Sequence, residues 1–437
     1  MQTHFTEAQL ADPLIREADA ILRKCVHCGF CTATCPTFVI TGDERDSPRG
    51  RIWMLREVLE SPETASGDTS YHIDRCLGCL SCTTTCPSGV DYAHLLDIGR
   101  EKLDHLVPRK TMDRLMRRML AAIIPHAPKF RMMMCLANLG RPFSFAMPQV
   151  MRAAMQKLPR QVPQLDPVGS RTEQFAATPS PSSSYGTAPV KRVILLAGCA
   201  QRALDPDINA STIRVLNRLG VEVIVRKEAH CCGALAHHIG ETKKADAAVR
   251  AAIDAWHEEI TAGEIDAIIV NASGCGTMVK DYGHLMRHDA EMAPLAVTIS
   301  AKAKDVSELL AELDLASILQ PQITSGCGTI AYHSACSLQH GQKIHDLPMA
   351  LLRQSGFDVV QPVDGHLCCG SAGVYNILQP AMASELQQRK LKSLQDTKAI
   401  AVAAGNIGCI TQLNSGALPV RHTIQFIDWA SGGPQPI

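Results

Sequence analysis

The 18 cysteines of this chain are not scattered along it. Eight form two runs with one spacing, Cys-x2-Cys-x2-Cys-x3-Cys-Pro, at Cys25–Pro36 and Cys76–Pro87. Eight more form two looser sets in the C-terminal half, which leaves Cys135 and Cys327 outside both groups. A chain of 437 residues can bury sizeable cores without disulfides, and its first residues do not resemble a secretory signal. Dense cysteine in a reducing compartment is typical of metal binding.

The spacing within the two runs predicts two [4Fe–4S] clusters. Three thiolates two residues apart can wrap one face of a four-iron cube, whereas the fourth points away and ligates the other cluster. One cluster is therefore expected to bind Cys25, Cys28, Cys31 and Cys86, and the other Cys76, Cys79, Cys82 and Cys35. Structural zinc sites use pairs of Cys-x2-Cys and would leave the third cysteine of each run unexplained. The other alternative to cluster binding is that the cysteines of the two runs form structural disulfides.

Other residues of the two runs are expected to support the loops. Gly29 and Gly78 keep side chains out of the crowded loop, and the fourth cysteine of each run is expected to begin a helix. His27 lies inside the first run. Because four thiolates already complete a cluster, we expect this histidine to lie beside the site without binding iron.

Residues from about 191 onward contain an internal repeat. Each copy has an apolar run that ends at a cysteine, Cys199 or Cys336, and a Cys-Cys-Gly motif whose first cysteine follows 32 positions later. A further cysteine, Cys275 or Cys409, completes each copy. Short β-branched runs alternate with longer helical stretches, a pattern that predicts parallel βα units. Ligand sites collect at the ends of strands in such sheets.

The repeat predicts two further thiolate sets in addition to the first eight ligands. Adjacent cysteines cannot form a relaxed disulfide with each other. The functional interpretation is that each copy gathers four metal-binding thiolates, whereas the alternative is that these cysteines are small buried apolar residues in tight turns. The two predicted sets are Cys199, Cys231, Cys232 and Cys275, and Cys336, Cys368, Cys369 and Cys409.

These patterns predict an α+β multidomain chain. An N-terminal α-helical ferredoxin-like domain with two [4Fe–4S] motifs precedes a tandem α/β domain made of two Cys-Cys-Gly (CCG) repeats. The expected parts are a helical domain at 1–95, a basic Met-rich helical segment at 96–160, a Pro/Ser-rich linker at 161–190, and repeats at 191–325 and 326–437.

The basic segment has an unusual composition. Residues 101–160 contain 12 Lys or Arg, 3 Asp or Glu and 9 of the 16 methionines, with an apolar stripe at Leu115, Met116, Met119, Leu120 and Ile123. A basic amphipathic helix of this kind can lie on an anionic membrane. The alternatives are a solvated basic face and a docking face for partner subunits. No apolar run is long enough to span a bilayer, and the zero net charge of the chain argues against nucleic-acid binding.

The amino-acid sequences of the motifs resemble those of a known family. The segments 18–37, 42–52, 74–100, 337–343, 366–373 and 406–409 are similar to the iron–sulfur subunit of bacterial glycolate oxidase, within the tandem-CCG iron–sulfur proteins. The resemblance implies a complex with flavin-bearing glycolate oxidase subunits, which carry FAD and oxidise glycolate to glyoxylate. This chain would pass their electrons to a membrane acceptor such as quinone, from a cytoplasmic position peripheral to the inner membrane.

The chain departs from the wider family at one position in each repeat. Heterodisulfide reductase repeats end in Cys-x2-Cys, but here Met278 and Gln412 stand where the fifth cysteine would be. A five-thiolate cluster is therefore not expected, whereas an ordinary additional cluster remains open. The alternatives are a subunit for D-lactate or another 2-hydroxy acid, and a thiol reductase like heterodisulfide reductase. The chain carries no dinucleotide fingerprint or other catalytic motif, so we expect an oxidoreductase subunit without its own substrate-oxidising site.

Overall fold

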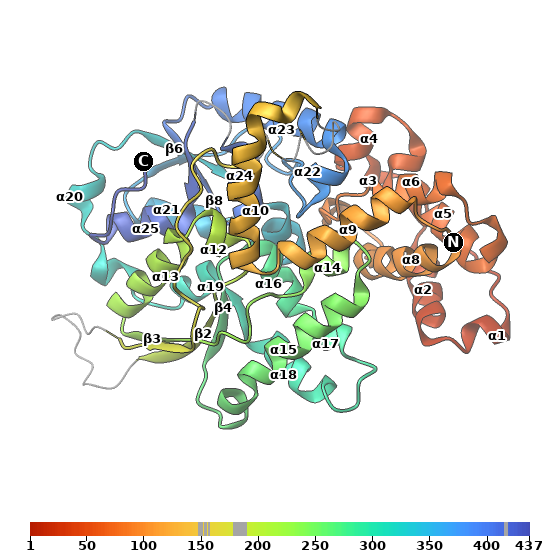
Figure 1. The fold of residues 1–437 in the computed structure, drawn as a ribbon, viewed down its shortest axis with the longest axis horizontal. Coiled ribbons are helices and arrows are strands. Elements are labelled where there is room, and N and C mark those ends of the chain that lie inside the picture. Colours follow the sequence, from red (N-terminus) through yellow and green to blue (C-terminus); the bar gives the residue numbers. More distant parts are fainter. Residues whose placement is uncertain (147–151, 153–154, 156–157, 178–189, 415–417) are drawn as a thin grey trace.

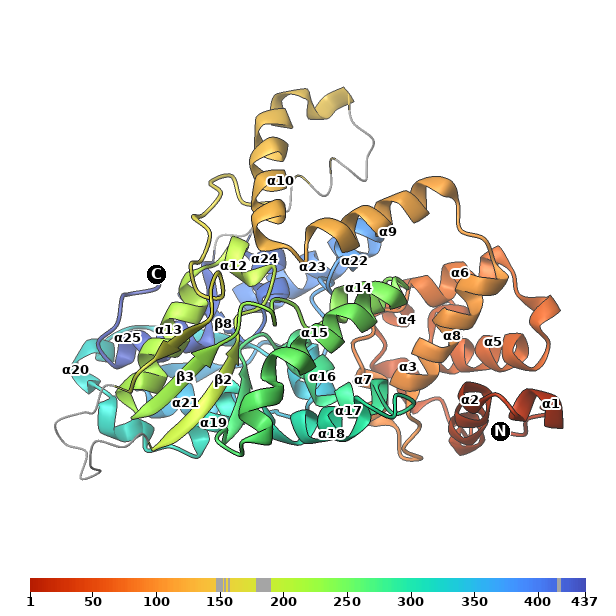
Figure 2. The same ribbon diagram turned by 60° about the horizontal axis from the view of Figure 1, so that its bottom comes forward.

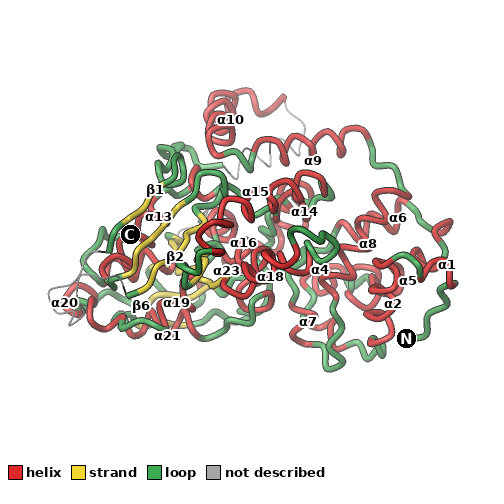
Figure 3. The backbone as a smooth tube through the Cα atoms, turned by 90° about the horizontal axis from the view of Figure 1, so that it is seen from below, coloured by secondary structure: helices red, strands yellow, loops and turns green. Residues whose placement is uncertain are grey.

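The computed structural model describes residues 1–146, 152, 155, 158–177, 190–414 and 418–437. An all-helical part built from the first 106 residues lies at one end of the molecule, and two β-sheets covered by helices lie at the other (Figure 1). Figure 3 shows the strands gathered entirely in the sheet-containing part. The mixed architecture predicted from the sequence is confirmed.

Three helices form the frame of the N-terminal part. They are α2 (Pro13–Lys24), α5 (Pro48–Glu60) and α8 (Tyr92–Leu106). Asp12 caps α2 and Pro13 occupies its first turn, where a missing amide hydrogen costs nothing. Gly99 allows α8 to approach α5 closely, because a Cβ atom there would lie 2.3 Å from Leu55 Cδ2. The shorter helices are α1 (Glu7–Leu10), α3 (Phe30–Ala33), α4 (Pro36–Thr41), α6 (Gly67–Asp74), α7 (Ser81–Thr85), η1 (Glu44–Asp46) and η2 (Pro62–Thr64).

The C-terminal part contains two parallel sheets among its described residues. The first has the strand order β1-β3-β2-β4-β5 and the second β7-β6-β8-β9, with only β1 antiparallel to its neighbour. The strands are β1 (Glu173–Phe175), β2 (Lys191–Leu196), β3 (Val221–Val225), β4 (Ala267–Val270), β5 (Ala303–Asp305), β6 (Thr329–His333), β7 (Asp358–Val360), β8 (Ala401–Ala404) and β9 (Val420–His422). Strands β2 and β6 are the apolar runs that precede Cys199 and Cys336, and the parallel pairing predicted for the repeats is present in both sheets.

Helices cover the two sheets and join them through one apolar core. Helix α13 (Asp207–Arg218) packs against α25 (Thr423–Ala430), and both Arg214 and Arg218 form ion pairs with the buried Asp428. The two repeats therefore form a single packed unit. The longer remaining helices are α15 (Thr242–Thr261), α16 (Ser273–Lys280), α18 (Ala293–Lys302), α21 (Leu347–Gln354), α23 (Pro380–Gln395) and α24 (Ile407–Leu413). The shorter ones are α12 (Gln201–Leu204), α14 (Ala234–His238), α17 (Tyr282–Leu285), α19 (Val306–Ala311), α20 (Pro321–Thr324), α22 (Tyr375–Leu378), η4 (Leu315–Ile318) and η5 (Ser337–Gly341).

The basic Met-rich segment forms α9 (Thr111–Ile123), α10 (Ala127–Gly140) and η3 (Arg141–Ala146). Helix α10 rises away from the rest of the molecule in Figure 2. The predicted apolar stripe of α9 is only partly buried: Leu120 is buried, but Leu115 and Met119 are exposed. Arg117 turns inward because it pairs with Asp74 at 2.9 Å.

The segment predicted as a linker is in part packed against the first sheet, because β1 lies within it and pairs with β3. Residues 178–189 of this predicted linker lie outside the described residues, as do 147–151, 153–154 and 156–157 of the basic segment. Within the described ranges, no helix combines the length and apolar character needed to cross a bilayer.

Candidate metal centres

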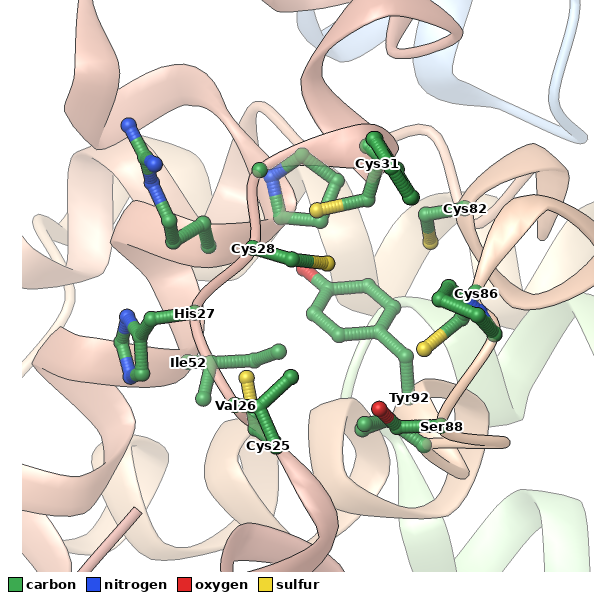
Figure 4. A pocket seen from close by; sticks show the side chains of 16 residues that line it. Cys25, Val26, His27, Cys28, Cys31, Ile52, Cys82, Cys86, Ser88 and Tyr92 are labelled. Atoms are coloured by element: carbon green, nitrogen blue, oxygen red, sulfur yellow. The ribbon is translucent and has the colours of Figure 1, made fainter.

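The first cysteine pocket brings together thiols from both runs. It has an empty volume of about 450 Å³, and Cys25, Cys28, Cys31 and Cys86 line it together with Cys82. Figure 4 shows the sulfurs of Cys25, Cys28, Cys31 and Cys86 pointing into a common space. The four residues that the spacing assigns to one cluster are therefore neighbours, even though Cys86 comes from the other run.

The second pocket contains the other predicted set. Cys35, Cys76, Cys79 and Cys82 line an empty volume of about 310 Å³. Cys82 faces both pockets, so the two sites are adjacent. Each pocket thus contains the four thiols predicted for one cluster, three from one run and one from the other, and Cys82 lines the first pocket as well as its own. This is the donor set that a pair of [4Fe–4S] clusters requires.

Backbone geometry explains part of the loop sequence. Gly29 and Gly78 both adopt positive φ angles, +84° and +62°. At Gly78 this conformation alone favours glycine, because a Cβ atom there would have open space around it, whereas at Gly29 it would also meet Arg49. Cys35 begins α4 as expected, but Cys86 follows the end of α7 and leads into a turn, so the expectation of a helix start at Cys86 is wrong.

A buried cation lies beside the second pocket. The Arg51 side chain is 1% exposed, donates to the Thr37 hydroxyl at 3.1 Å and to the His72 carbonyl at 2.8 Å, and lies 3.9 Å from Cys35 Sγ. Its carboxylate partner, Asp46, also contacts Arg75 and His72. Three buried or half-buried basic groups therefore surround one carboxylate, which leaves positive charge next to the thiols.

Hydrogen bonds to sulfur are concentrated at the same pocket. The Tyr92 hydroxyl donates to Cys76 Sγ at 3.6 Å and the Gly78 amide donates to it at 3.5 Å. Burial would raise the pKa of the Cys76 thiol, but the charges of Arg51 and Arg100 lower it below its usual range. By contrast, burial raises the pKa of Cys31 in the first pocket to about 11. Protein groups thus stabilise negative charge on the sulfur of Cys76, whereas burial raises the pKa of Cys79 and Cys82 in the same pocket well above the usual range.

The thiols of the second repeat also lie together. Cys336 Sγ and Cys368 Sγ are 3.7 Å apart, and Cys369 interacts with both Cys368 and Cys409. The Gly370 amide donates to Cys368 Sγ at 3.5 Å. The group follows the ends of three parallel strands: β6 ends three residues before Cys336, β8 five before Cys409 and β7 eight before Cys368, which places the four sulfurs at one edge of the sheet.

The first repeat gathers its thiols in the same way. Cys199 interacts with Cys231, and Cys232 interacts with both Cys231 and Cys275. These neighbouring thiols, together with burial, raise the pKa of Cys232 well above its usual range. The predicted grouping is therefore present in both copies, whereas metal binding by these eight cysteines stays a prediction. Cys135 is exposed and Cys327 is half-buried, and neither belongs to a group.

The second ferredoxin-like pocket packs directly against the second repeat. Leu77 and Cys79 share an apolar cluster with Cys336, Cys368 and Tyr375. The Tyr375 hydroxyl donates to the Arg75 carbonyl at 3.0 Å. Thr84 and His340 are hydrogen-bonded at 2.8 Å. The four-thiol groups of the N-terminal part and of the second repeat are therefore close neighbours in space.

Three histidines next to the cysteine motifs can now be placed. His27 stacks edge-on against Trp53, with its ring 5.8 Å from the indole ring, and lies among the residues lining the first pocket. His230 is hydrogen-bonded to the Glu228 carbonyl at 3.1 Å, so it satisfies a backbone group. His366 is exposed. Sequence reasoning missed Arg51, Tyr92 and His333, which reach the thiols from other elements.

Comparison with known proteins agrees with this architecture. Residues 21–90 match the 4Fe-4S dicluster domain family, and residues 193–280 and 330–414 match the cysteine-rich CCG domain family. The first match covers the eight cysteines of the two pockets. The other two cover the repeats, so the iron–sulfur character of the chain rests on family membership as well as on thiol geometry.

Curated relatives match nearly the whole chain. The glycolate oxidase iron–sulfur subunit of Escherichia coli (strain K12) is 42% identical over 98% of this chain and 99% of its own length. The probable glycolate oxidase iron–sulfur subunit of Bacillus subtilis (strain 168) is 29% identical over 90% of this chain and 89% of its own. A lactate utilization protein A from Oceanobacillus iheyensis is 24% identical over 51% of this chain and 88% of its own. The chain belongs to the family of glycolate oxidase iron–sulfur subunits.

Proposed function

We propose that this chain is the electron-transfer subunit of a flavin-dependent glycolate dehydrogenase complex. The observation that carries the proposal is the pair of adjacent four-thiol pockets, each completed by a cysteine from the other run. A [4Fe–4S] cluster, when bound, accepts and releases one electron at a time. Substrate oxidation and FAD are assigned to partner subunits, which is why the chain needs no catalytic residue of its own.

The chain's own residues support a directional path. The rim of the first pocket includes Val26 and Phe30, and the Phe30 side chain is 62% exposed. Trp53 is also exposed beside His27. Exposed aromatic and apolar side chains are enriched where proteins dock. We therefore assign this rim to the flavin-bearing partner, and the buried second pocket to transfer deeper into the chain.

Glycolate is favoured over D-lactate as the substrate because the glycolate oxidase relative aligns with more of this chain than the lactate utilization relative does. The glycolate oxidase relative from Escherichia coli aligns along the whole chain, whereas the lactate utilization protein aligns over about half of it. A thiol reductase is less favoured because Gln412, at the position of the missing fifth cysteine, uses its side chain in hydrogen bonds to Asn376 and to backbone carbonyls.

The experiment uses the complex reconstituted with its flavin-bearing subunits. Cys28→Ser and Cys79→Ser should each abolish glycolate-driven reduction of a quinone analogue, while flavin reduction by glycolate persists. Cys135→Ser is the matched control, because this thiol is exposed and belongs to no group. Normal electron flux in either pocket variant would contradict the proposal. If the complex oxidised D-lactate faster than glycolate, the proposed substrate would be wrong but the proposed electron path would stand.

We also propose that the complex associates peripherally with the cytoplasmic face of the inner membrane through α10 and η3. Large apolar side chains are exposed on these elements, with Leu139 77% exposed. The others include Met132, Leu136, Phe143 and Phe145. Arg114, Arg118 and Lys129 are exposed nearby on α9 and α10, a combination suited to anionic lipid.

Vesicle sedimentation tests this placement. The complex should sediment with vesicles containing anionic lipid and be released by high salt, and Leu136→Ser combined with Leu139→Ser should weaken sedimentation about tenfold or more, since each leucine contributes roughly 1–2 kcal/mol when buried in lipid. Val363→Ser, on an exposed apolar residue elsewhere, is the control. Equal binding by the double variant and the wild type would contradict this surface.

A further inference from the structure

A buried histidine lies among the thiols of the second repeat with no partner of its own. His333 is the last residue of β6 and is 1% exposed. Neither Nδ1 nor Nε2 has a hydrogen-bond partner. A ring nitrogen, Cys369 Sγ and Cys409 Sγ all lie within 4.8 Å of one another. A buried polar group without a partner is uncommon, and it points to a ligand that the ring is placed to bind.

The first repeat has no such histidine. Leu196 lies three positions before Cys199, as His333 lies three before Cys336. The register confirms the equivalence, because Leu196 pairs with Val270 and His333 with Ala404, each five positions before the last cysteine of its set. The two copies therefore differ in chemistry at the same point of the fold.

A second difference concerns charge. Lys390 on α23 is 2% exposed, donates to the Asp364 carbonyl at 2.6 Å and lies near Cys368, Cys369 and Cys409. Gly370 packs on the Ala383 carbonyl as Gly233 packs on that of Ala245, so Lys390 corresponds to the buried Ala252. A buried ammonium next to thiols favours a site that becomes negatively charged when filled.

We propose that the second repeat binds an iron–sulfur cluster through Cys336, Cys368, Cys369, Cys409 and the imidazole of His333. The His333 imidazole supplies a fifth donor in place of the fifth cysteine, whose position is occupied by Gln412 in this chain. Imidazole is an established ligand of cluster iron in proteins. The first repeat, with Leu196 and Ala252 at the equivalent positions, lacks both the imidazole and the cation.

The choice of iron as the metal rests on the proposed function. The position of the site also suits that function. Cys336 and Cys368 share the apolar cluster that contains Cys79 of the second ferredoxin-like pocket. The proposed cluster would therefore continue the path from that pocket. Equivalent thiols of the first repeat have no place in this apolar cluster.

The test is pulsed EPR on the full chain, prepared anaerobically, labelled with ¹⁵N-histidine and reduced with dithionite. A strongly coupled histidine nitrogen is expected in the wild type. It should vanish in His333→Leu, which gives the second repeat the residue of the first, and in His333→Cys. The leucine variant should also lose roughly four iron atoms per chain, whereas the cysteine variant, which restores a donor, should retain them. His422→Leu, another buried histidine in the same sheet, is the control and should keep the coupling.

The signals of the two ferredoxin-like clusters serve as the internal measure of folding. No coupled nitrogen in the wild type, an unchanged coupling in His333→Leu, or stoichiometric zinc in place of iron would each overturn the inference while those signals remain. Their absence from wild-type protein would instead refute the proposed function.

Discussion

Replacing Arg51 with methionine should lower the reduction potential of the cluster in the second pocket. The substitution preserves much of the side-chain length but removes a cation that lies 3.9 Å from Cys35 Sγ and contacts Thr37, His72 and Asp46. An added electron makes a cluster more negative, so a nearby positive charge stabilises the reduced form. Asp46 keeps Arg75 and His72 as partners, and the free energy of unfolding should fall by about 3 kcal/mol or less.

The size of the shift follows from the Coulomb energy. At an effective dielectric constant of about 20, two unit charges about 4 Å apart interact by about 4 kcal/mol. Asp46 offsets part of this, and the added electron is spread over the cluster, so about half remains. A free energy of about 2 kcal/mol corresponds to roughly 80 mV for a one-electron couple.

The assay is an EPR-monitored redox titration of anaerobically prepared protein. Arg49→Met is the matched control, because Arg49 lines the first pocket but its side chain is 37% exposed and paired with Glu44, so solvent screens its charge. We expect the second-pocket signal to move down by roughly 80 mV in Arg51→Met. The control should move the first-pocket signal by less. A second-pocket potential unchanged within about 15 mV, in folded protein with full iron content, would refute the reasoning.

Three further outcomes are expected. Burial opposes the charge on His94, but hydrogen bonds to Asp281 and Asp91 raise its pKa to about 10, so the stabilisation that this charge provides is complete below about pH 6.5 and is lost between that pH and 10. The His94→Gln substitution should therefore lower the free energy of unfolding by about 1–2 kcal/mol at pH 6 and by little at pH 10. An equal loss at both pH values in denaturant titrations would argue against this ion pair. Removing iron with a chelator under reducing conditions should raise hydrogen exchange throughout residues 21–90. Strands β2, β4, β6 and β8 should stay protected, because the sheets have a large apolar core of their own. An equal loss of protection in both parts would contradict this expectation. Gly370→Ala should lower the melting temperature by several degrees, since φ is +85° and the new Cβ would lie 2.7 Å from the Ala383 carbonyl, and an unchanged melting curve would show that the turn can relax.

The grouping of thiols in space followed directly from their spacing in the sequence. The rule that a fourth cysteine serves the other cluster placed Cys86 with Cys25 and Cys35 with Cys76, and both pockets have this composition. The parallel strands of the repeats were equally accessible, because β-branched runs such as Val221–Val225 alternate with helical stretches. The strands β5 and β9, of three residues each, carry too little pattern to be seen.

The surroundings of the thiols could not be predicted in the same way. Arg51 reaches Cys35 across 16 positions and Tyr92 reaches Cys76 across another 16, so neither contact leaves a local signal. The burial pattern of α9 could not be predicted for a related reason: Asp74, far away in sequence, pairs with the buried Arg117, whereas Leu115 is exposed. The position of His333, three residues before Cys336 where the first copy has leucine, was visible in the sequence, but its unpartnered ring was not.

The account depends most directly on the contents of the two N-terminal pockets. Iron and acid-labile sulfide, measured together on anaerobically purified, folded protein, should each amount to at least about eight atoms per chain, with dithionite-reduced EPR signals from two neighbouring clusters. Folded protein that lacks labile sulfide, or that holds zinc in these pockets, would contradict it.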